Sequence, residues 1–440
     1  MNLIDAARNG DISTLNKLLD EGADPNVLSV DPNNSKNDGR LPLVVAAINS
    51  NATSSLETVK LLLERGADIN LQEKGGYTAL YAASRYSNTS STLQTVKLLL
   101  DKNADPNIVS DNGHSPLEEA VQKSNTESSI ETVKLLLERR ANIDAQDKQG
   151  FTPLIVAARN SNTTSSVETV KVLLQKGANV NIQNVKGFTA LMLAARNSNV
   201  DSSLETVTLL LQLEADVNLQ NSEGFTALIL AARNSNRESS VETVKILLDR
   251  GANPNLLNNN GKSALQLAVR FSNSDSSLET VKLLLEYGAD PFVEIECPTV
   301  ECEKLIALYR WKLLHQRDID TAKRYSVNAE MKLPKEVWEI ILMNKRQQQL
   351  CKNLSNDKNI HLLILFAEEL GIPIQENMTK GKLCGLISRQ LAYGKESKYS
   401  GFAERDLNKY RKDILIMARK LGIDTTQSTE DILKTLSKIM

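Results

Sequence analysis

The chain contains few of the residues that form disulfides, zinc clusters or aromatic pockets. Its 440 residues include four cysteines and three histidines, and aromatic residues make up 4% of the total. No Cys-x-x-Cys pair occurs, so we expect neither a disulfide framework nor a cysteine-histidine zinc cluster. The cysteines are expected to be reduced, as in an intracellular protein. No metal and no cofactor are predicted.

The sequence also lacks long apolar runs and the common catalytic motifs. The N-terminal residues MNLIDAARNGD do not form a signal peptide pattern, and no apolar run has membrane-spanning length. Gly-x-x-x-x-Gly-Lys-Ser/Thr, Gly-x-Ser-x-Gly and His-Glu-x-x-His are absent. Cys351 and His361 are close in sequence, but no third group orients them for nucleophilic catalysis. We therefore expect an intracellular protein without enzymatic activity.

A repeat of 37 residues dominates the chain. The tripeptide Glu-Thr-Val begins at six positions in the same phase, and Gln-Thr-Val fills the one remaining position: Glu57, Gln94, Glu131, Glu168, Glu205, Glu242 and Glu279. A glycine recurs with the same period, at Gly39, Gly76, Gly113, Gly150, Gly187, Gly224 and Gly261. A fixed period of this size indicates small units that bury their apolar faces only by stacking. Such stacks present surfaces to partners, so the repeat favours a binding function.

Each repeat is predicted to hold two short helices. In residues 223–258, Thr226 is expected to cap a first helix rich in small residues. Val244, Leu247 and Leu248 at i, i+3 and i+4 predict the buried stripe of a second helix. Ser239 is expected to start that second helix by forming a capping box with the glutamate three residues later. The equivalent pairs are Ser54/Glu57, Ser91/Gln94, Ser128/Glu131, Ser165/Glu168, Ser202/Glu205 and Ser276/Glu279.

The order of these features resembles the ankyrin repeat. Gly-x-Thr-x-Leu, Ala-Ala and Gly-Ala-Asp/Asn-x-Asn recur in register over residues 1–292, and Thr152-Pro153-Leu154 is the best copy of the family signature. The resemblance implies a mainly α solenoid of helix-turn-helix units with hairpin fingers. Ankyrin repeats have a period of about 33 residues. The four additional residues lie between the two helices, as in residues 162–165, and are expected to decorate an edge away from the fingertips.

The predicted organisation has six parts. Residues 1–27 form an N-terminal capping repeat, and residues 38–292 form seven repeats that start at 38, 75, 112, 149, 186, 223 and 260. Residues 293–331 are a helical connector, residues 332–356 an F-box-like segment, and residues 357–395 and 405–440 two helix-loop-helix units.

Two sets of residues are candidates for binding a protein partner. Arginines in a column at the ends of the first helices suit a carboxylate-rich partner: Arg85, Arg159, Arg196, Arg233 and Arg270. The alternative is that each arginine bonds the carbonyls of the neighbouring loop. The second set lies at the fingertips, which usually meet partners in ankyrin-like proteins: Lys74, Asp111, Lys148, Lys186, Glu223 and Asn259.

The segment after residue 331 resembles the opening of an F-box. Leu333-Pro334-x-Glu336 precedes the apolar run Ile340-Ile341-Leu342. The resemblance implies docking of the Skp-type adaptor of cullin ubiquitin ligases, with candidate contacts at Leu333, Pro334, Val337, Trp338 and Ile341. The alternative is a helix of a packed domain. Ankyrin arrays with such a segment are similar to ankyrin proteins of amoeba-infecting giant DNA viruses, which implies a host target in the host cytoplasm.

The C-terminal tail contains a second, smaller duplication. Leu370-Gly371-Ile372 matches Leu421-Gly422-Ile423, each followed by a polar link and a further helical pattern. This arrangement resembles the SAP motif, a module associated with nucleic acid. Basic residues that would contact phosphates are Lys380, Lys382, Arg389, Lys409, Arg411 and Lys412. Interleaved acids favour ordinary solvated faces instead. The alternative function is therefore a scaffold or tether whose tail, residues 357–440, binds nucleic acid or another protein.

Overall fold

The computed structural model describes residues 2–29 and 39–299, together with scattered residues between 301 and 435. The chain divides into two compact units, Met1–Glu296 and Cys297–Met440. The F-box-like segment and its five candidate docking residues lie outside the described residues. Of the six basic tail residues only Lys382 is described.

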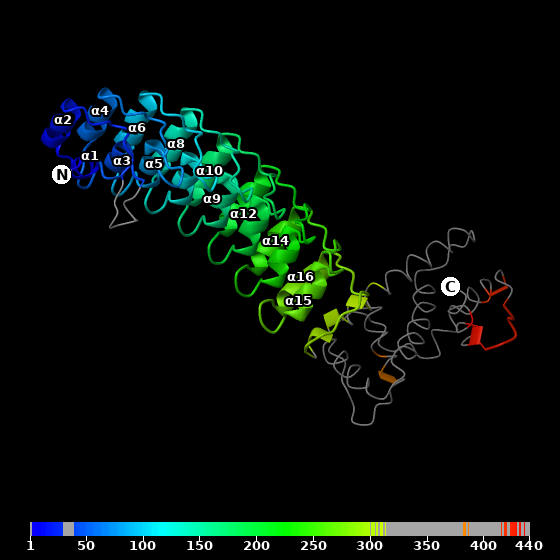
Figure 1. Cartoon of the computed structure of the whole chain (residues 1–440). Coiled ribbons are helices and arrows are strands. Elements are labelled where there is room, and N and C mark those ends of the chain that lie inside the picture. Colours follow the sequence, from blue (N-terminus) through cyan, green and yellow to red (C-terminus); the bar gives the residue numbers. More distant parts are fainter. Residues whose placement is uncertain are drawn as a thin grey trace. The chain divides into compact units, whose positions relative to one another are not determined.

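Short helices alternate along the first unit (Figure 1). The first helices have seven residues: α1 (Leu3–Asn9), α3 (Pro42–Ile48), α5 (Ala79–Arg85), α7 (Pro116–Gln122), α9 (Pro153–Arg159), α11 (Ala190–Arg196), α13 (Ala227–Arg233) and α15 (Ala264–Arg270). The second helices have nine: α2 (Ile12–Asp20), α4 (Leu56–Glu64), α6 (Leu93–Asp101), α8 (Ile130–Glu138), α10 (Val167–Gln175), α12 (Leu204–Gln212), α14 (Val241–Asp249) and α16 (Leu278–Glu286). No strand occurs among the described residues, and no helix there is long and apolar enough to span a membrane. The predicted mainly α repeat solenoid is confirmed.

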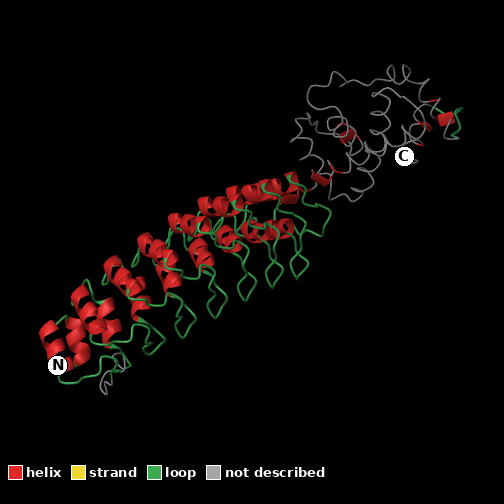
Figure 2. Ribbon diagram, turned by 90° about the horizontal axis from the view of Figure 1, so that it is seen from above, coloured by secondary structure: helices red, strands yellow, loops and turns green. Residues whose placement is uncertain are grey.

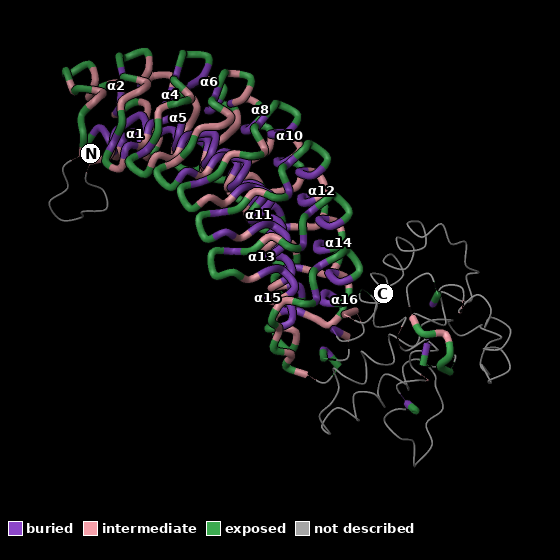
Figure 3. The backbone as a smooth tube through the Cα atoms, turned by 90° about the vertical axis from the view of Figure 1, so that its right-hand side faces the viewer, coloured by how far each residue is buried: buried purple, intermediate pink, exposed green. Residues whose placement is uncertain are grey.

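The two kinds of helix form two rows, and the loops before the first helices project to one side as fingers (Figure 2). The buried residues lie between the rows (Figure 3). Ala194 and Ala195 of α11 are fully buried, because small side chains let each first helix pack closely on the next. Val244 and Leu247 of α14 are also fully buried, which confirms the predicted apolar stripe. Stacking buries a core that a single repeat lacks.

The capping boxes predicted for the second helices are wrong. The N-cap lies one residue later, and its hydroxyl accepts the N–H of the threonine in Glu-Thr-Val: Ser55, Thr92, Ser129, Ser166, Ser203, Ser240 and Ser277. The preceding serine has another role. The Ser239 hydroxyl lies 3.3 Å from that of Ser198 in the previous repeat, and the Thr243 hydroxyl lies 2.7 Å from the same Ser198 oxygen. Burial forces these hydroxyls to bond one another, and this requirement overrides the local capping motif.

Each finger is hydrogen-bonded to the next through its backbone. The Ser222 N–H donates to the Lys186 carbonyl at 3.0 Å, and the same bond recurs between the other fingertips. The approach is so close that a Cβ on Gly187 would lie 2.7 Å from the Ser222 nitrogen. Gly187 also has a φ of +77°, which glycine adopts without strain. Glycine is therefore required at this position both for its positive φ and for the close approach of the next finger.

The four additional residues of each repeat form a second ladder on the other side of the stack. The Asn199 N–H donates to the Glu238 carbonyl at 3.0 Å, and the Asn199 side chain donates to the Arg237 carbonyl at 3.1 Å. Backbone bonds of this kind recur at Asn51, Asn88, Asn125, Asn162 and Asn236. The insertion lies between the two helices, as predicted, but it does more than decorate an edge, because the inserted turns hold neighbouring repeats together.

The turn after each second helix supplies a third link. The side chain of Asn181 accepts the N–H of Asp216 in the next repeat at 2.8 Å. Before this turn the backbone adopts the left-handed conformation even where glycine is replaced, with φ of +64° at Asn103, +66° at Arg140 and +61° at Glu214. Asparagine tolerates this conformation, whereas arginine and glutamate are strained in it. The stack thus keeps the turn geometry at a local cost.

The finger glycines provide a matched test of stacking. Gly187→Ala adds backbone strain and also a clash with the next finger, whereas Gly261→Ala adds only strain, because nothing lies within 4 Å of its Cβ position. We expect Gly261→Ala to lower the free energy of unfolding by about 1–2 kcal/mol. Gly187→Ala is expected to lower it by a further 1–3 kcal/mol, as overpacking does. Urea unfolding followed by circular dichroism measures both, and equal losses would show that the close approach does not matter.

Candidate functional site

A groove runs between the fingers and the inserted turns. The part of it that lies over α11 and α13 is a pocket of about 500 Å³, and the name groove is used below for this pocket. Fingers, first helices and inserted turns contribute in turn to its lining, which consists of Phe188, Asn221, Glu223, Phe225, Arg196, Leu230, Arg233, Asn234, Arg237, Glu238 and Asp275. The insertion therefore forms a wall of the groove, a role that sequence reasoning did not assign to it.

Four of the five predicted arginines have no ion-pair partner in the described residues: Arg159, Arg196, Arg233 and Arg270. The guanidinium of Arg233 lies 5.1 Å from the centre of the Phe271 ring, and that of Arg270 lies 5.6 Å from it, which are cation–π contacts. The Arg196 Nε donates to the Asn197 side chain at 3.0 Å. None of the five donates to a backbone carbonyl in the part of the chain that the structure describes. The described residues therefore show no bond of the alternative kind, from an arginine to the carbonyls of the neighbouring loop.

The predicted fingertip residues are all exposed: Lys74, Asp111, Lys148, Lys186, Glu223 and Asn259. Their backbones belong to the ladder between fingers, as where the Asp111 N–H donates to the Gly75 carbonyl at 2.9 Å. Glu223 is the member of this set that also lines the pocket. Their part in partner binding stays a prediction.

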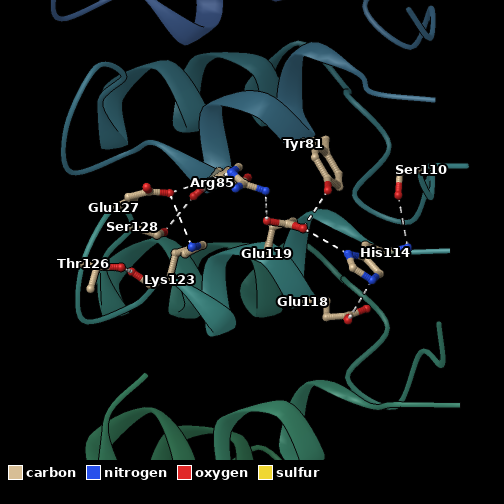
Figure 4. A network of polar contacts seen from close by, with 11 residues as sticks. Tyr81, Arg85, Ser110, His114, Glu118, Glu119, Lys123, Thr126, Glu127 and Ser128 are labelled. Carbon is tan, nitrogen blue, oxygen red and sulfur yellow. Dashed lines mark hydrogen bonds and ion pairs between the residues drawn. The ribbon is translucent and has the colours of Figure 1, made fainter. Parts of the chain in front are cut away.

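The fifth arginine, Arg85, belongs to a buried polar cluster in the third and fourth repeats (Figure 4). Its guanidinium is 2.9 Å from the Glu119 carboxylate, whose side chain is 2% exposed. Tyr81 donates its hydroxyl to Glu119 at 2.7 Å, and His114 Nδ1 lies 3.1 Å from the same oxygen. Glu118 and Asp147 lie on the other side of the His114 ring, 3.8 Å and 3.5 Å from Nε2.

The surroundings of Glu118 and Glu119 shift the pKa values of these two carboxylates in opposite directions. Burial raises the pKa of Glu118 to about 8, although His114 opposes the shift. Burial acts in the same direction on Glu119, but the bonds from His114 and Tyr81 and the charge of Arg85 outweigh it and hold the pKa of Glu119 below its usual value. The hydrogen bond with Glu119 raises the pKa of His114, against the effect of burial. An anion at Glu119 therefore faces a histidine that favours its protonated form.

Sequence reasoning missed this cluster, although the repeat itself carried a signal. The positions equivalent to His114 hold Phe151, Phe188 and Phe225, and those equivalent to Glu118 hold Ile155, Met192 and Ile229. Titratable residues at positions that are apolar in other repeats distinguish the fourth repeat from them. Which groups face one another depended on stacking, because Tyr81 and Arg85 come from the third repeat and Asp147 comes from the next finger.

Comparison with known families agrees with this architecture. A family model that describes ankyrin repeats (3 copies) matches the chain over five overlapping ranges, residues 3–110, 51–147, 87–184, 117–221 and 191–295. The chain is an ankyrin-repeat protein. The ankyrin resemblance is thereby confirmed, and ankyrin repeats are protein–protein interaction modules that are generally not enzymes. No curated protein matches the chain.

Two cysteines of this ankyrin-repeat protein are described, both in the second unit. Cys297 and Cys302 are free thiols whose sulfur atoms lie 3.3 Å apart. The hydrogen bond from Cys302 lowers the pKa of Cys297. The other two cysteines, Cys351 and Cys384, lie outside the described residues.

A second pocket of the ankyrin repeats contains a buried acid. Glu73 has a side chain that is 1% exposed, lies 2.9 Å from Arg40 and accepts the Leu41 N–H at 3.2 Å. The pocket has a volume of about 390 Å³ and is otherwise lined mainly by Tyr77, Tyr81 and Tyr86. Burial raises the pKa of Glu73 to about 7, because it outweighs the opposing charge of Arg40. Glu73 therefore titrates near neutral pH.

The raised pKa of Glu73 predicts a pH-dependent stability. The folded protein keeps a proton up to about pH 7, whereas the unfolded chain releases it near the ordinary value of 4.5. The contribution of Glu73 is thus most favourable below pH 4.5 and is lost as the pH rises to about 7. Relative to Glu73→Gln, which does not titrate, the wild type should lose up to about 3 kcal/mol between pH 5 and pH 8. Urea unfolding across this range measures the difference, and parallel pH profiles would contradict it.

Proposed function

We propose that the groove binds an extended acidic segment of a protein partner. The supporting observation is the state of Arg233. Its Nε is buried and has no hydrogen-bond partner in the described residues, and its guanidinium lies over Phe271 at the groove surface. The Arg233 guanidinium forms no ion pair in the described residues, so a carboxylate bound in the pocket would give it a charged partner.

The column of arginines supports the same choice of ligand. Arg159, Arg196, Arg233 and Arg270 repeat every 37 residues and form no ion pair in the described residues. The pocket lining also contains three acids, Glu223, Glu238 and Asp275, which equal Arg196, Arg233 and Arg237 in number, and Asp275 is already paired with Arg237 at 3.1 Å. The arginine column therefore offers positive charge and forked donors suited to carboxylates.

The repeat also sets the spacing of the ligand. Packed neighbouring helices lie about 8–10 Å apart. An extended peptide advances about 3.3 Å per residue. A segment that lies along the groove would therefore present a carboxylate at about every third residue.

Synthetic peptides test this proposal on the full chain. The probe is a fluorescent peptide with glutamate at every third residue between glycine and serine, and its comparison peptide has glutamine instead. We expect the glutamate peptide to bind more weakly as salt increases. Arg196→Gln combined with Arg233→Gln should weaken binding at least tenfold, as measured by fluorescence anisotropy.

Arg237→Gln is the matched control, because it removes the same charge in the same pocket from a side chain that is already paired with Asp275. Its effect should stay below about threefold, as expected for a paired exposed charge. Equal binding of the glutamine peptide, or an unchanged affinity in the double variant, would overturn the proposal.

The C-terminal part of the proposal is recruitment of a ubiquitin-ligase adaptor. It rests on the F-box-like sequence around Leu333 and Pro334, and together with the resemblance to viral ankyrin proteins it would bring a host target held by the repeats to the ligase. Leu333→Asp with Ile341→Asp in the full chain should abolish co-purification of a Skp-type adaptor. The repeats provide the control, because Arg196→Gln should leave co-purification unchanged. An adaptor that is retained by the Leu333→Asp, Ile341→Asp variant would exclude this role.

A further inference from the structure

Three metal-ligating side chains meet at the base of two adjacent fingers. His114 and Glu118 come from the fourth repeat, and Asp147 comes from the finger that precedes α9. One ligand atom from each lies within 4.8 Å of the others. His114 Nε2 is 3.8 Å from Glu118 Oε1 and 3.5 Å from Asp147 Oδ2. Ligands at 2.0–2.2 Å from a tetrahedral zinc ion lie about 3.3–3.6 Å apart. The two distances from His114 Nε2 are close to this spacing, and the two carboxylates would have to move toward one another to close the set.

The His114 ring is held in the orientation that a metal ligand needs. Its Nδ1 lies 3.1 Å from the Glu119 carboxylate, so the imidazole donates there, and Nε2 faces the other two side chains, where a metal ion would displace its proton. Figure 4 shows the ring between Glu119 and Glu118. Tyr81 and Arg85 fix Glu119 in turn, at 2.7 and 2.9 Å. A carboxylate behind a ligating histidine is the usual outer shell of a metal site.

Glu118 is a second, independent indication of a ligand. Its side chain is 7% exposed, yet the carboxylate has only weak partners in the described residues: the Ser115 N–H and His114 Nε2. Asp147 differs, since its Oδ1 accepts the backbone N–H groups of Gln149 and Phe151 at 2.8 and 2.7 Å, which fixes its side chain. A buried carboxylate without a strong donor is costly, and a cation between these groups would remove that cost.

We propose that His114, Glu118 and Asp147 bind one divalent transition-metal ion, with zinc as the best match. One imidazole and two carboxylates suit zinc better than magnesium or calcium, which prefer oxygen ligands alone. The His114 side chain is 30% exposed, so the fourth position is open to water or to a carboxylate of a partner. The ion joins two neighbouring fingers and stiffens this part of the stack. This site is separate from the arginine groove and does not depend on it.

Sequence differences between repeats supply substitutions that fit the fold. Asp147 has asparagine at the equivalent positions Asn184, Asn221 and Asn258, and His114 has phenylalanine at three. Asp147→Asn and His114→Phe therefore convert the site to residues that the same fingers already hold elsewhere. Asp111→Asn is the control, because Asp111 is an exposed carboxylate at the tip of the same finger, outside the cluster.

Calorimetric titration of the chelator-treated full chain with Zn²⁺ tests the site. We expect binding of one ion at the cluster, at least tenfold weaker in Asp147→Asn and in His114→Phe and unchanged in Asp111→Asn. Zn²⁺ should also raise the thermal midpoint of the wild type and leave that of Asp147→Asn unchanged. Mg²⁺ should bind much more weakly than Zn²⁺.

The Cys297–Cys302 pair is a competing zinc ligand, and Co²⁺ spectra distinguish the two sites. Cobalt at the proposed site has nitrogen and oxygen ligands and therefore no thiolate charge-transfer absorption. Wild-type binding that shows thiolate absorption and persists in Asp147→Asn would overturn the proposal, and so would the absence of any Zn²⁺ binding. If His114→Phe does not fold, Asp147→Asn decides alone, because three other fingers already carry asparagine there.

Discussion

The structure depends on polar groups in each repeat finding their hydrogen-bond partners in the next one. The fingertip N–H groups, the inserted turns and the Asx side chains all bond to the corresponding part of the adjacent layer of the stack, as at Ser222, Asn199 and Asn181. Buried hydroxyls such as Ser161 and Thr206 do the same. A change in length of one residue would misalign all these ladders together. This requirement gives a physical reason for a period of 37 residues that does not slip. At the end of the array, the buried Ser272 hydroxyl has no partner in the described residues.

The ladders bear on function because they fix both walls of the groove. Fingers and inserted turns are loops, yet each is tied to its neighbours, so side chains such as Arg233 and Glu223 are held on a rigid frame. Copied residues then form a repeating surface, whereas a residue that departs from the pattern has a local role. Glu119 of the fourth repeat is such a residue. It pairs with Arg85 of the third repeat, whereas Arg159, at the equivalent position, forms no ion pair in the described residues.

Much of the fold followed from periodicity. The Val244 and Leu247 stripe and the Thr226 cap of the first helix are local properties of one repeat, so the sequence predicts them. The residue that caps the second helix could not be predicted from periodicity, because two adjacent serines, such as Ser239 and Ser240, both suit the local motif. The neighbouring repeat decides which of them is the cap. The His114 cluster was missed for the same reason. Its residues suggest no site when each is taken alone, and Tyr81 and Arg85 meet Glu119 only when two repeats stack.

Amide hydrogen exchange at single-residue resolution tests the central claim, that exposed loops are ordered by bonds across repeat boundaries. The decisive amides are those of Ser222 at a fingertip and Asn199 in an inserted turn, because both lie in loops and donate only to the neighbouring repeat. The account predicts protection comparable with that of amides inside α11 and α13. Exchange of these two amides at the rate of an unstructured loop would contradict it.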